Sequence, residues 1–120
     1  MELYLGGCHQ GKTDYVAGHT GLRPVRCTPE EALSAPAINC FHLLVRDILS
    51  QGGDPAAFTQ TLLERNPDAV VVSDEIGLGI VPLDPFERAW RVATGRALCT
   101  LAQCAVRVER ISCGLGQRIK

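Results

Sequence analysis

The chain has 120 residues, of which 46% are hydrophobic and 21% are charged, and 12 Lys and Arg residues nearly balance 13 Asp and Glu residues. This length and composition predict one globular domain over residues 1–120 and exclude a disordered chain. A net charge of −1 supplies no broad field for nucleic acid or anionic lipid, so we expect neither nucleic acid nor a membrane as a partner.

The apolar segments are short, and the cysteines are scattered along the chain. No uninterrupted apolar run approaches the length of a membrane span, and Met1–Leu5 lacks the cationic start and long apolar core of a signal peptide, so we expect a cytoplasmic protein. None of the six cysteines forms a C-x-x-C pair, which favours free thiols over disulfides and argues against a zinc site.

Apolar patterns, helix caps and turn residues predict alternating strands and helices. In chain order these are a strand at Leu3–Leu5, a helix at Lys12–Gly18, a weaker strand at Arg23–Cys27, a capped helix from Thr28-Pro29 that ends by Ala35, a helix at Cys40–Ser50, a helix from Asp54-Pro55 to about Asn66, a strand at Ala69–Val72, a helix of some 20 residues from Asp84-Pro85, a strand with one exposed face at Val106–Ile111, and a turn at Gly114–Gly116 into a final segment. This order predicts an α/β fold, a three-layer sandwich around a mainly parallel sheet.

The first predicted strand and helix flank a glycine-rich segment that matches G-x-x-x-x-G-K-[ST] at every defined position: Gly6, Gly7, Cys8, His9, Gln10, Gly11, Lys12 and Thr13. In a phosphate-binding P-loop, backbone N–H groups surround the phosphates, the lysine reaches the β- and γ-phosphates, and the hydroxyl ligates Mg²⁺. The strand–loop–helix context favours this interpretation and a P-loop NTPase-like, RecA-like fold. The alternative is a glycine bend with a surface lysine.

A P-loop enzyme also needs an acidic residue at a strand end, to hold Mg²⁺ or its water. The apolar run Val70–Val72 is followed by Ser73, Asp74 and Glu75, so Asp74 and Glu75 are the candidate carboxylates. Because ligands of open α/β sheets bind at the carboxyl ends of the strands, we expect this end to lie beside the P-loop. The alternative role for either carboxylate is capping of a turn.

Four segments resemble the adenosylcobinamide kinase/adenosylcobinamide-phosphate guanylyltransferase family. They are the P-loop, the run Glu-Ile-Gly-x-Gly-Ile-Val-Pro within Asp74–Pro82, the R-x-x-x-G-R helix segment Arg91–Arg96, and the ending Cys113–Lys120. Together they cover the first dozen residues and nearly everything from Ala69 onward. The resemblance implies a P-loop kinase of cobalamin biosynthesis that uses ATP or GTP with Mg²⁺ and acts on a corrinoid-type substrate. It also implies a homo-oligomer, since members of the family are homotrimers.

The middle of the chain departs from the family pattern. The family's guanylylated histidine lies in a longer segment, of which the sequence keeps only the H-x-x-x-R-P spacing of His19 to Pro24. His19 is therefore a possible guanylylation site, and the alternative is a surface histidine at the end of a short helix. Asn39 stands where family members carry an acid, and His42 nearby is either a catalytic base or a packed helix histidine.

These patterns predict a nucleoside-triphosphate-dependent kinase. Lys12, Glu75 and His42 are the expected catalytic residues, Thr13, Asp74 and Glu75 the expected metal ligands, and guanylyl transfer is expected to be weak or lost. Two alternatives stay open: a nucleotide-binding regulatory or scaffold protein that has lost catalysis, and a kinase for another small hydroxyl compound.

Overall fold

The computed structural model describes residues 1–77 and 79–120. The family-like segment Asp74–Pro82 therefore includes one position, Leu78, that lies outside the described residues. The strands are β1 (Glu2–Gly6), β2 (Val25–Arg26), β3 (Ala37–Asn39), β4 (Val70–Asp74), β5 (Arg107–Ser112) and β6 (Leu115–Arg118). The helices are α1 (Lys12–Thr20), α2 (Pro29–Ala32), α3 (Phe41–Ser50), α4 (Pro55–Arg65) and α5 (Pro85–Cys104).

The strands form one sheet in the order β2-β3-β4-β1-β5-β6. Every neighbouring pair is parallel except β5 and β6, which form an antiparallel hairpin. The two central strands are β4 and β1, and their carboxyl ends lie side by side because Gly6 pairs in register with Asp74. The predicted α/β fold with a mainly parallel sheet is confirmed.

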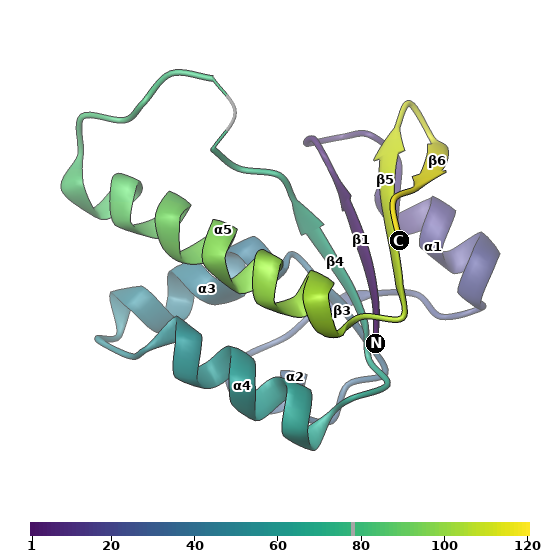
Figure 1. Cartoon of the computed structure of the whole chain (residues 1–120), viewed down its shortest axis with the longest axis horizontal. Coiled ribbons are helices and arrows are strands. Elements are labelled where there is room, and N and C mark those ends of the chain that lie inside the picture. Colours follow the sequence, from purple (N-terminus) through teal and green to yellow (C-terminus); the bar gives the residue numbers. More distant parts are fainter. Residues whose placement is uncertain (78) are drawn as a thin grey trace.

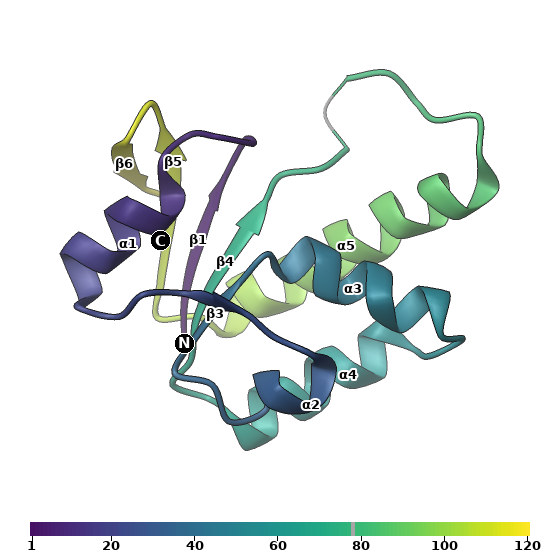
Figure 2. The same cartoon turned by 180° about the vertical axis from the view of Figure 1, so that it is seen from behind.

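Helices cover both faces of this sheet (Figures 1 and 2). Helices α3, α4 and α5 lie over one face, where they bury Leu3, Ile38, Val71 and Val108 from four neighbouring strands. Helix α1 lies over the other face, where Val16 packs with residues of a second, smaller core that includes Tyr4 and Val72 from β1 and β4. This arrangement is the predicted three-layer sandwich.

Short-range signals explain the helix starts. Thr28 accepts a hydrogen bond from the N–H of Glu31, and the Glu31 side chain accepts one from the N–H of Thr28, which completes a capping box. The carboxylates of Asp54 and Asp84 cap α4 and α5 by accepting hydrogen bonds from backbone N–H groups of the first turn, and each is followed by a proline at the first helical position.

Two features differ from the sequence expectation. The final segment continues past the turn as strand β6, paired antiparallel with β5. The exposed face expected for β5 is interrupted, because Glu109 is buried with only 2% of its surface exposed. The Tyr15 hydroxyl from α1 and the Arg107 guanidinium each donate to its carboxylate over 2.6 Å. Burial alone would raise the pKa of Glu109, but these two hydrogen bonds and the Arg107 charge outweigh it and lower that pKa.

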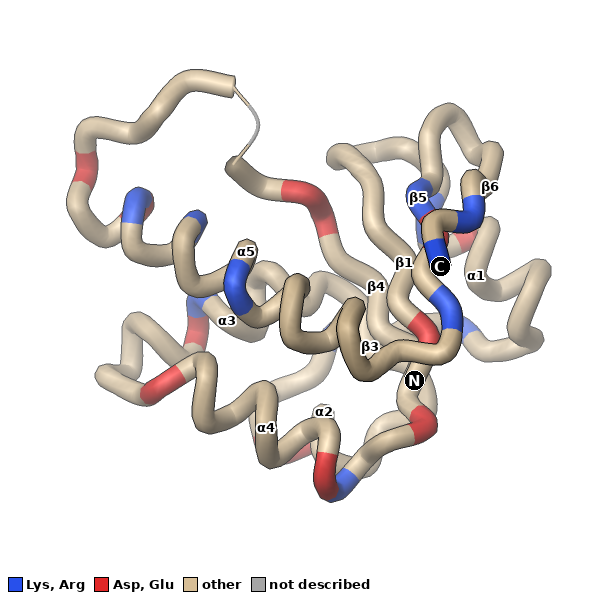
Figure 3. Tube along the Cα trace, viewed as in Figure 1, with Lys and Arg blue, Asp and Glu red and all other residues tan. Residues whose placement is uncertain are grey.

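Charged residues are distributed over the whole chain, with acidic and basic positions interspersed (Figure 3). No described helix is both long and apolar enough to cross a membrane. All six cysteines are free thiols.

Candidate functional site

The predicted P-loop lies at the carboxyl end of the sheet, between the end of β1 at Gly6 and the start of α1 at Lys12. His9 and Gly11 adopt left-handed backbone conformations, with φ of 57° and 83°. These turns curl the loop around a cavity of about 390 Å³. The cavity is lined by Cys8, His9, Gln10, Gly11, Lys12, Thr13, Asp14, Asn39, Cys40 and Asp74.

The Lys12 side chain crosses this loop and is 8% exposed. Its ammonium group donates to the carbonyl of Gly7 over 2.6 Å and lies 2.7 Å from a carboxylate oxygen of Asp74. The contact with Asp74 follows from the fold, since β1 and β4 are neighbours, Asp74 ends β4, and Lys12 begins the helix that the loop connects to β1. An ammonium group and a carboxylate, expected from separate sequence motifs, thus meet at one cavity.

His42 is the second side chain that contacts Asp74. The backbone N–H of Asp74 donates to Nδ1 of His42 over 3.1 Å, so the neutral ring carries its proton on Nε2, which lies 3.5 Å from Oδ2 of Asp74. Burial lowers the pKa of His42; the Asp74 carboxylate opposes this shift, while Lys12 and Arg26 reinforce it. His42 is 6% exposed and does not line the P-loop cavity.

Glu75 points in a different direction from Asp74, as neighbouring residues at a strand end do. Its carboxylate lies 2.7 Å from the Arg110 guanidinium of β5, and its N–H donates to the carbonyl of Gly6 over 2.9 Å. The structure therefore brings Asp74 to Lys12 but keeps Glu75 outside the P-loop cavity.

Glu75 instead lines an adjoining cavity of about 310 Å³, which shares Cys8 and Asp74 with the P-loop cavity. Trp90 and Arg91 from α5 form its opposite wall. The Trp90 indole N–H donates to the carbonyl of His42 over 2.7 Å, which fixes the ring in place. The second cavity is thus built from the strand end and the first half of α5.

Arg46 and Arg91 stabilise the α5 side of this cavity. Arg46 makes two hydrogen bonds to the Glu87 carboxylate, at 2.6 and 3.0 Å, and its guanidinium lies 4.7 Å from the centre of the Trp90 ring. Arg91 donates to the carbonyl of Ile80 over 2.7 Å and so tethers the segment that follows β4. These contacts orient the indole and the loop without using the Glu75 carboxylate.

His19 lies in the last turn of α1 and is exposed. Its ring stacks on that of Tyr15 at 3.9 Å between centroids, and Nδ1 lies 3.0 Å from the Tyr15 carbonyl. It does not line the P-loop cavity. The structure thus separates His19 from Lys12 and Asp74.

The sequence of the chain matches a protein-family model. The model of the cobinamide kinase / cobinamide phosphate guanyltransferase family matches residues 30–119, which is 90 of the 120 residues. The chain belongs to this family. The match begins after Gly6–Thr13, so the interpretation of that segment as a P-loop rests on its own pattern and position. No match was found among curated proteins.

Family membership places the chain among the transferases of cobalamin biosynthesis, which use ATP or GTP as the nucleotide substrate. The residues around the P-loop fit a Mg²⁺ ion, because the Thr13 hydroxyl and the Asp74 carboxylate are hard oxygen donors on one cavity. Within the described residues no three His, Cys, Asp or Glu side chains gather as a metal site. Mg²⁺ uses one or two protein ligands together with phosphate and water.

Gln10 is a site residue for which the sequence suggested no separate role. Its carbonyl and side-chain oxygens accept hydrogen bonds from Gly114 and Cys113, over 2.8 and 2.7 Å. Cys113 and Gly114 both have positive φ and form the tight turn between β5 and β6. The ending Cys113–Lys120, a family-like segment in the sequence, therefore supports the back of the P-loop.

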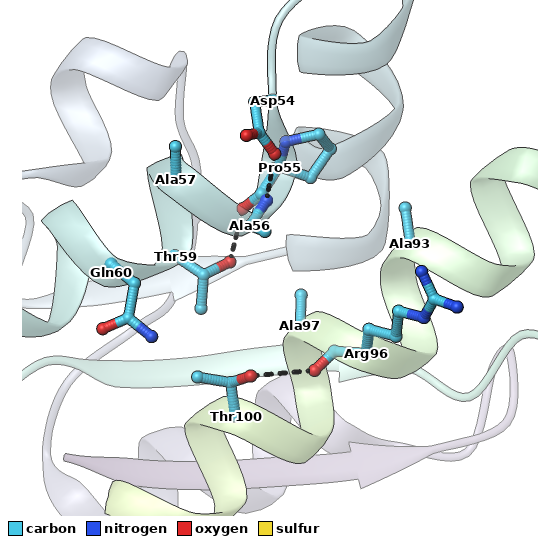
Figure 4. A pocket seen from close by; sticks show the side chains of 10 residues that line it. All are labelled: Asp54, Pro55, Ala56, Ala57, Thr59, Gln60, Ala93, Arg96, Ala97 and Thr100. Atoms are coloured by element: carbon cyan, nitrogen blue, oxygen red, sulfur yellow. Dashed lines mark hydrogen bonds between the residues drawn. The ribbon is translucent and has the colours of Figure 1, made fainter.

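A further cavity of about 400 Å³ lies between α4 and α5, remote from these residues (Figure 4). Its walls consist mostly of small side chains, such as Ala56, Ala93 and Ala97, with Arg96 at the rim. It shares no lining residue with the P-loop cavity. Its chemistry gives no indication of phosphate or metal binding.

Proposed function

We propose that the protein is a P-loop kinase that transfers the γ-phosphoryl group of ATP or GTP to the aminopropanol hydroxyl of adenosylcobinamide. The observation that carries this proposal is the meeting of Lys12 and Asp74 over the P-loop cavity, at 2.7 Å. Phosphoryl transfer relies on positioned charges and alignment more than on covalent chemistry, and this cavity offers both signs of charge within one cradle.

The proposed roles follow the walls of the first cavity. The backbone N–H groups of Gly6–Thr13 bind the phosphates, and Lys12 neutralises charge on the β- and γ-phosphates. Thr13 and Asp74 would hold Mg²⁺, which neutralises phosphate charge in this chemistry. His42 orients Asp74 through the Asp74 N–H, a role that its burial favours over direct contact with substrate. A direct role of His42 as a base stays a prediction.

The adjoining cavity suits the acceptor. It shares Asp74 with the first cavity, and Glu75 faces it. In the proposed step the acceptor oxygen forms a bond to the γ-phosphorus while the bond from that phosphorus to the β–γ bridging oxygen breaks. The Glu75 carboxylate takes the hydroxyl proton. Trp90 provides a flat apolar wall for the acceptor group.

We propose that guanylyl transfer is weak or lost. His19 is exposed and stacked on Tyr15, outside the P-loop cavity, which favours the surface-histidine interpretation. Incubation with labelled GTP followed by acid treatment tests this proposal. Acid-labile label on His19 would overturn it.

We further propose that residues 1–120 act as one cytoplasmic domain within a homo-oligomer, and the family resemblance favours a trimer. The side chains of Ile80 and Leu83 are 94% and 92% exposed, and apolar groups of this kind are common at subunit contacts. Sedimentation equilibrium tests the oligomer.

The kinase activity is tested with γ-labelled ATP or GTP and adenosylcobinamide. We expect transfer by the wild-type protein, and a loss of about a hundredfold in kcat for Asp74→Asn, since a preorganised charge is removed. Asp68→Asn is the matched control, because Asp68 is exposed and precedes β4 at its opposite end. Equal activity of the two variants would refute the role of Asp74.

A second candidate is a nucleotide-binding regulatory or scaffold protein that has lost catalysis. Asn39 favours it, since this uncharged side chain lines the P-loop cavity and its oxygen is engaged by the N–H of Cys40 at 2.9 Å. Tight Mg²⁺-dependent nucleotide binding without transfer to any hydroxyl compound would support this candidate. Transfer to a different small hydroxyl compound would instead identify a kinase with another acceptor.

A further inference from the structure

Another cavity, of about 450 Å³ and called the α1 cavity below, lies between one face of α1 and the turn that joins β5 and β6. It is lined by Gly11, Asp14, Tyr15, Gly18, His19 and Gly114. Residues 11, 14, 15, 18 and 19 follow the spacing of a single helix face, so this wall is continuous along α1. The roles proposed above for the acceptor cavity and the metal ligands assign no function to this cavity.

This cavity continues the P-loop cavity. Gly11 and Asp14 line both of them, so the two spaces meet at the start of α1. The turn at Gly114 closes against the loop, because a Cβ on Gly11 would lie 3.3 Å from the Gly114 Cα. A ligand whose phosphates lie in the P-loop would therefore have space for a further group beside α1.

The walls of the α1 cavity match a flat, partly polar group. Tyr15 and His19 are nearly parallel, at 20° between ring planes, and His19 is exposed. The Tyr15 hydroxyl is held by Glu109 at 2.6 Å, so the pair has a fixed orientation. The Asp14 side chain is 88% exposed and lies 3.7 Å from the Arg23 guanidinium, and its remaining acceptor positions can take hydroxyl or amino groups at the junction with the P-loop. Stacking surfaces and edge acceptors are what nucleosides use.

Gly18 keeps the middle of this wall open. A Cβ placed on Gly18 would meet no atom within 4 Å, although the residue lies inside a helix where larger side chains are more favourable. A side chain at this position would project from the lined face of α1 into unfilled space.

We propose that the α1 cavity binds the nucleoside part of the nucleotide, with the base against the Tyr15–His19 pair and the ribose near Asp14. The inference rests on the proposed function, since it requires a triphosphate in the P-loop. The proposed function places the phosphates in the P-loop. The inference adds a binding site for the nucleoside, the group that inorganic polyphosphate lacks.

The experiment compares GTP and ATP with inorganic tripolyphosphate, which has no nucleoside, by isothermal titration calorimetry in the presence of Mg²⁺. Gly18→Leu fills the cavity and leaves the P-loop intact. Gly95→Leu is the matched control, because Gly95 also lies inside a helix, α5, with nothing within 4 Å of an added Cβ. Both substitutions replace glycine by a better helix former, so both variants are expected to fold.

We expect Gly18→Leu to weaken binding of the preferred nucleotide by about tenfold or more, the range of one lost base–aromatic contact. Tripolyphosphate binding should not change, and Gly95→Leu should resemble the wild type for both ligands. His19→Ala is a second variant, with the same expected pattern and a smaller effect, because it removes half of the stacked pair.

The possible results separate the two proposals. If the wild type binds neither nucleotide nor tripolyphosphate, the proposed function fails and the inference fails with it. If the wild type binds nucleotide and Gly18→Leu does not weaken it, or weakens tripolyphosphate equally, the nucleoside assignment alone is overturned. A selective loss of nucleotide affinity in Gly18→Leu supports it.

Discussion

Gly116 in β6 allows a close approach between the hairpin and α1, and its replacement by alanine gives a sharp test of this structure. An added Cβ would overlap the Tyr15 hydroxyl and would lie 2.8 Å from a carboxylate oxygen of Glu109. The exposed position of Gly116 suggests tolerance to substitution, but the structure predicts the opposite.

The expected loss of stability follows from the hydrogen bond that the Tyr15 side chain would lose. Its hydroxyl donates to the buried Glu109 carboxylate over 2.6 Å, and a hydrogen bond to a charged group contributes about 1.5–3 kcal/mol. Overpacking costs about 1–3 kcal/mol when neighbours cannot move. The Tyr15 ring can avoid the added Cβ only by breaking its hydrogen bond to Glu109. The variant therefore loses either the energy of this hydrogen bond or the energy of overpacking, but not the sum of both. We expect Gly116→Ala to lower the free energy of unfolding by about 2 kcal/mol.

Urea denaturation followed by circular dichroism measures this change, and a double-mutant cycle with Tyr15→Leu identifies its cause. In the Tyr15→Leu background the overlap with the tyrosine is removed, so Gly116→Ala should cost clearly less than in the wild type. Gly95→Ala is the control and should stabilise the protein slightly, since it adds a helix former in open space. A cost of Gly116→Ala that is the same in both backgrounds would refute the reasoning.

Further predictions concern stability. Thr94 is fully buried, and its hydroxyl has no partner among the described residues, so Thr94→Val should leave the free energy of unfolding unchanged or raise it. Thr59→Val removes a buried hydroxyl that donates to the carbonyl of Pro55 over 2.7 Å, so it should lower the free energy of unfolding in the same urea assay. Because the fold lowers the pKa of Glu109, the stability that this group contributes is present above the ordinary glutamate pKa and is lost as the pH falls below it. Urea unfolding from neutral to acidic pH should therefore show a steeper decline for the wild type than for Glu109→Gln. Arg46→Lys loses the two-point contact with Glu87 and the planar stack on α5, and should lower the melting temperature more than Arg23→Lys does at an exposed, longer ion pair.

The sequence was sufficient for features with local causes. The P-loop pattern predicted the loop between β1 and α1, and the pairs Asp54-Pro55 and Asp84-Pro85 predicted the starts of α4 and α5. The run Val70–Val72 indicated a strand covered on both faces, because each of its side chains is apolar. Each of these signals lies within a few residues of its effect.

Features that depend on distant residues were not predictable in this way. Strand β3 has three residues, too few for a periodic pattern to be visible. The burial of Glu109 depends on Tyr15, 94 residues earlier in the chain, and the placement of His42 against Asp74 depends on a contact across 32 residues. Side-chain identity alone predicts an exposed glutamate and leaves the histidine ambiguous, since the partner comes only from the topology of the sheet.

The same topology explains how one lysine can serve two anions. Lys12 is paired with Asp74, so a triphosphate bound in the loop would have to take the ammonium group from that carboxylate. The exchange need not leave Asp74 unpaired, because nucleotides are bound with Mg²⁺ and the carboxylate can then face the metal. Since the backbone N–H of Asp74 donates to His42, the position of Asp74 does not depend on Lys12 alone, and the carboxylate would keep its position while its partner changes. On this argument His42 acts by holding Asp74 in place, so that the exchange of partners requires little structural reorganisation. Loss of the His42 ring should then slow phosphoryl transfer more than it weakens nucleotide binding.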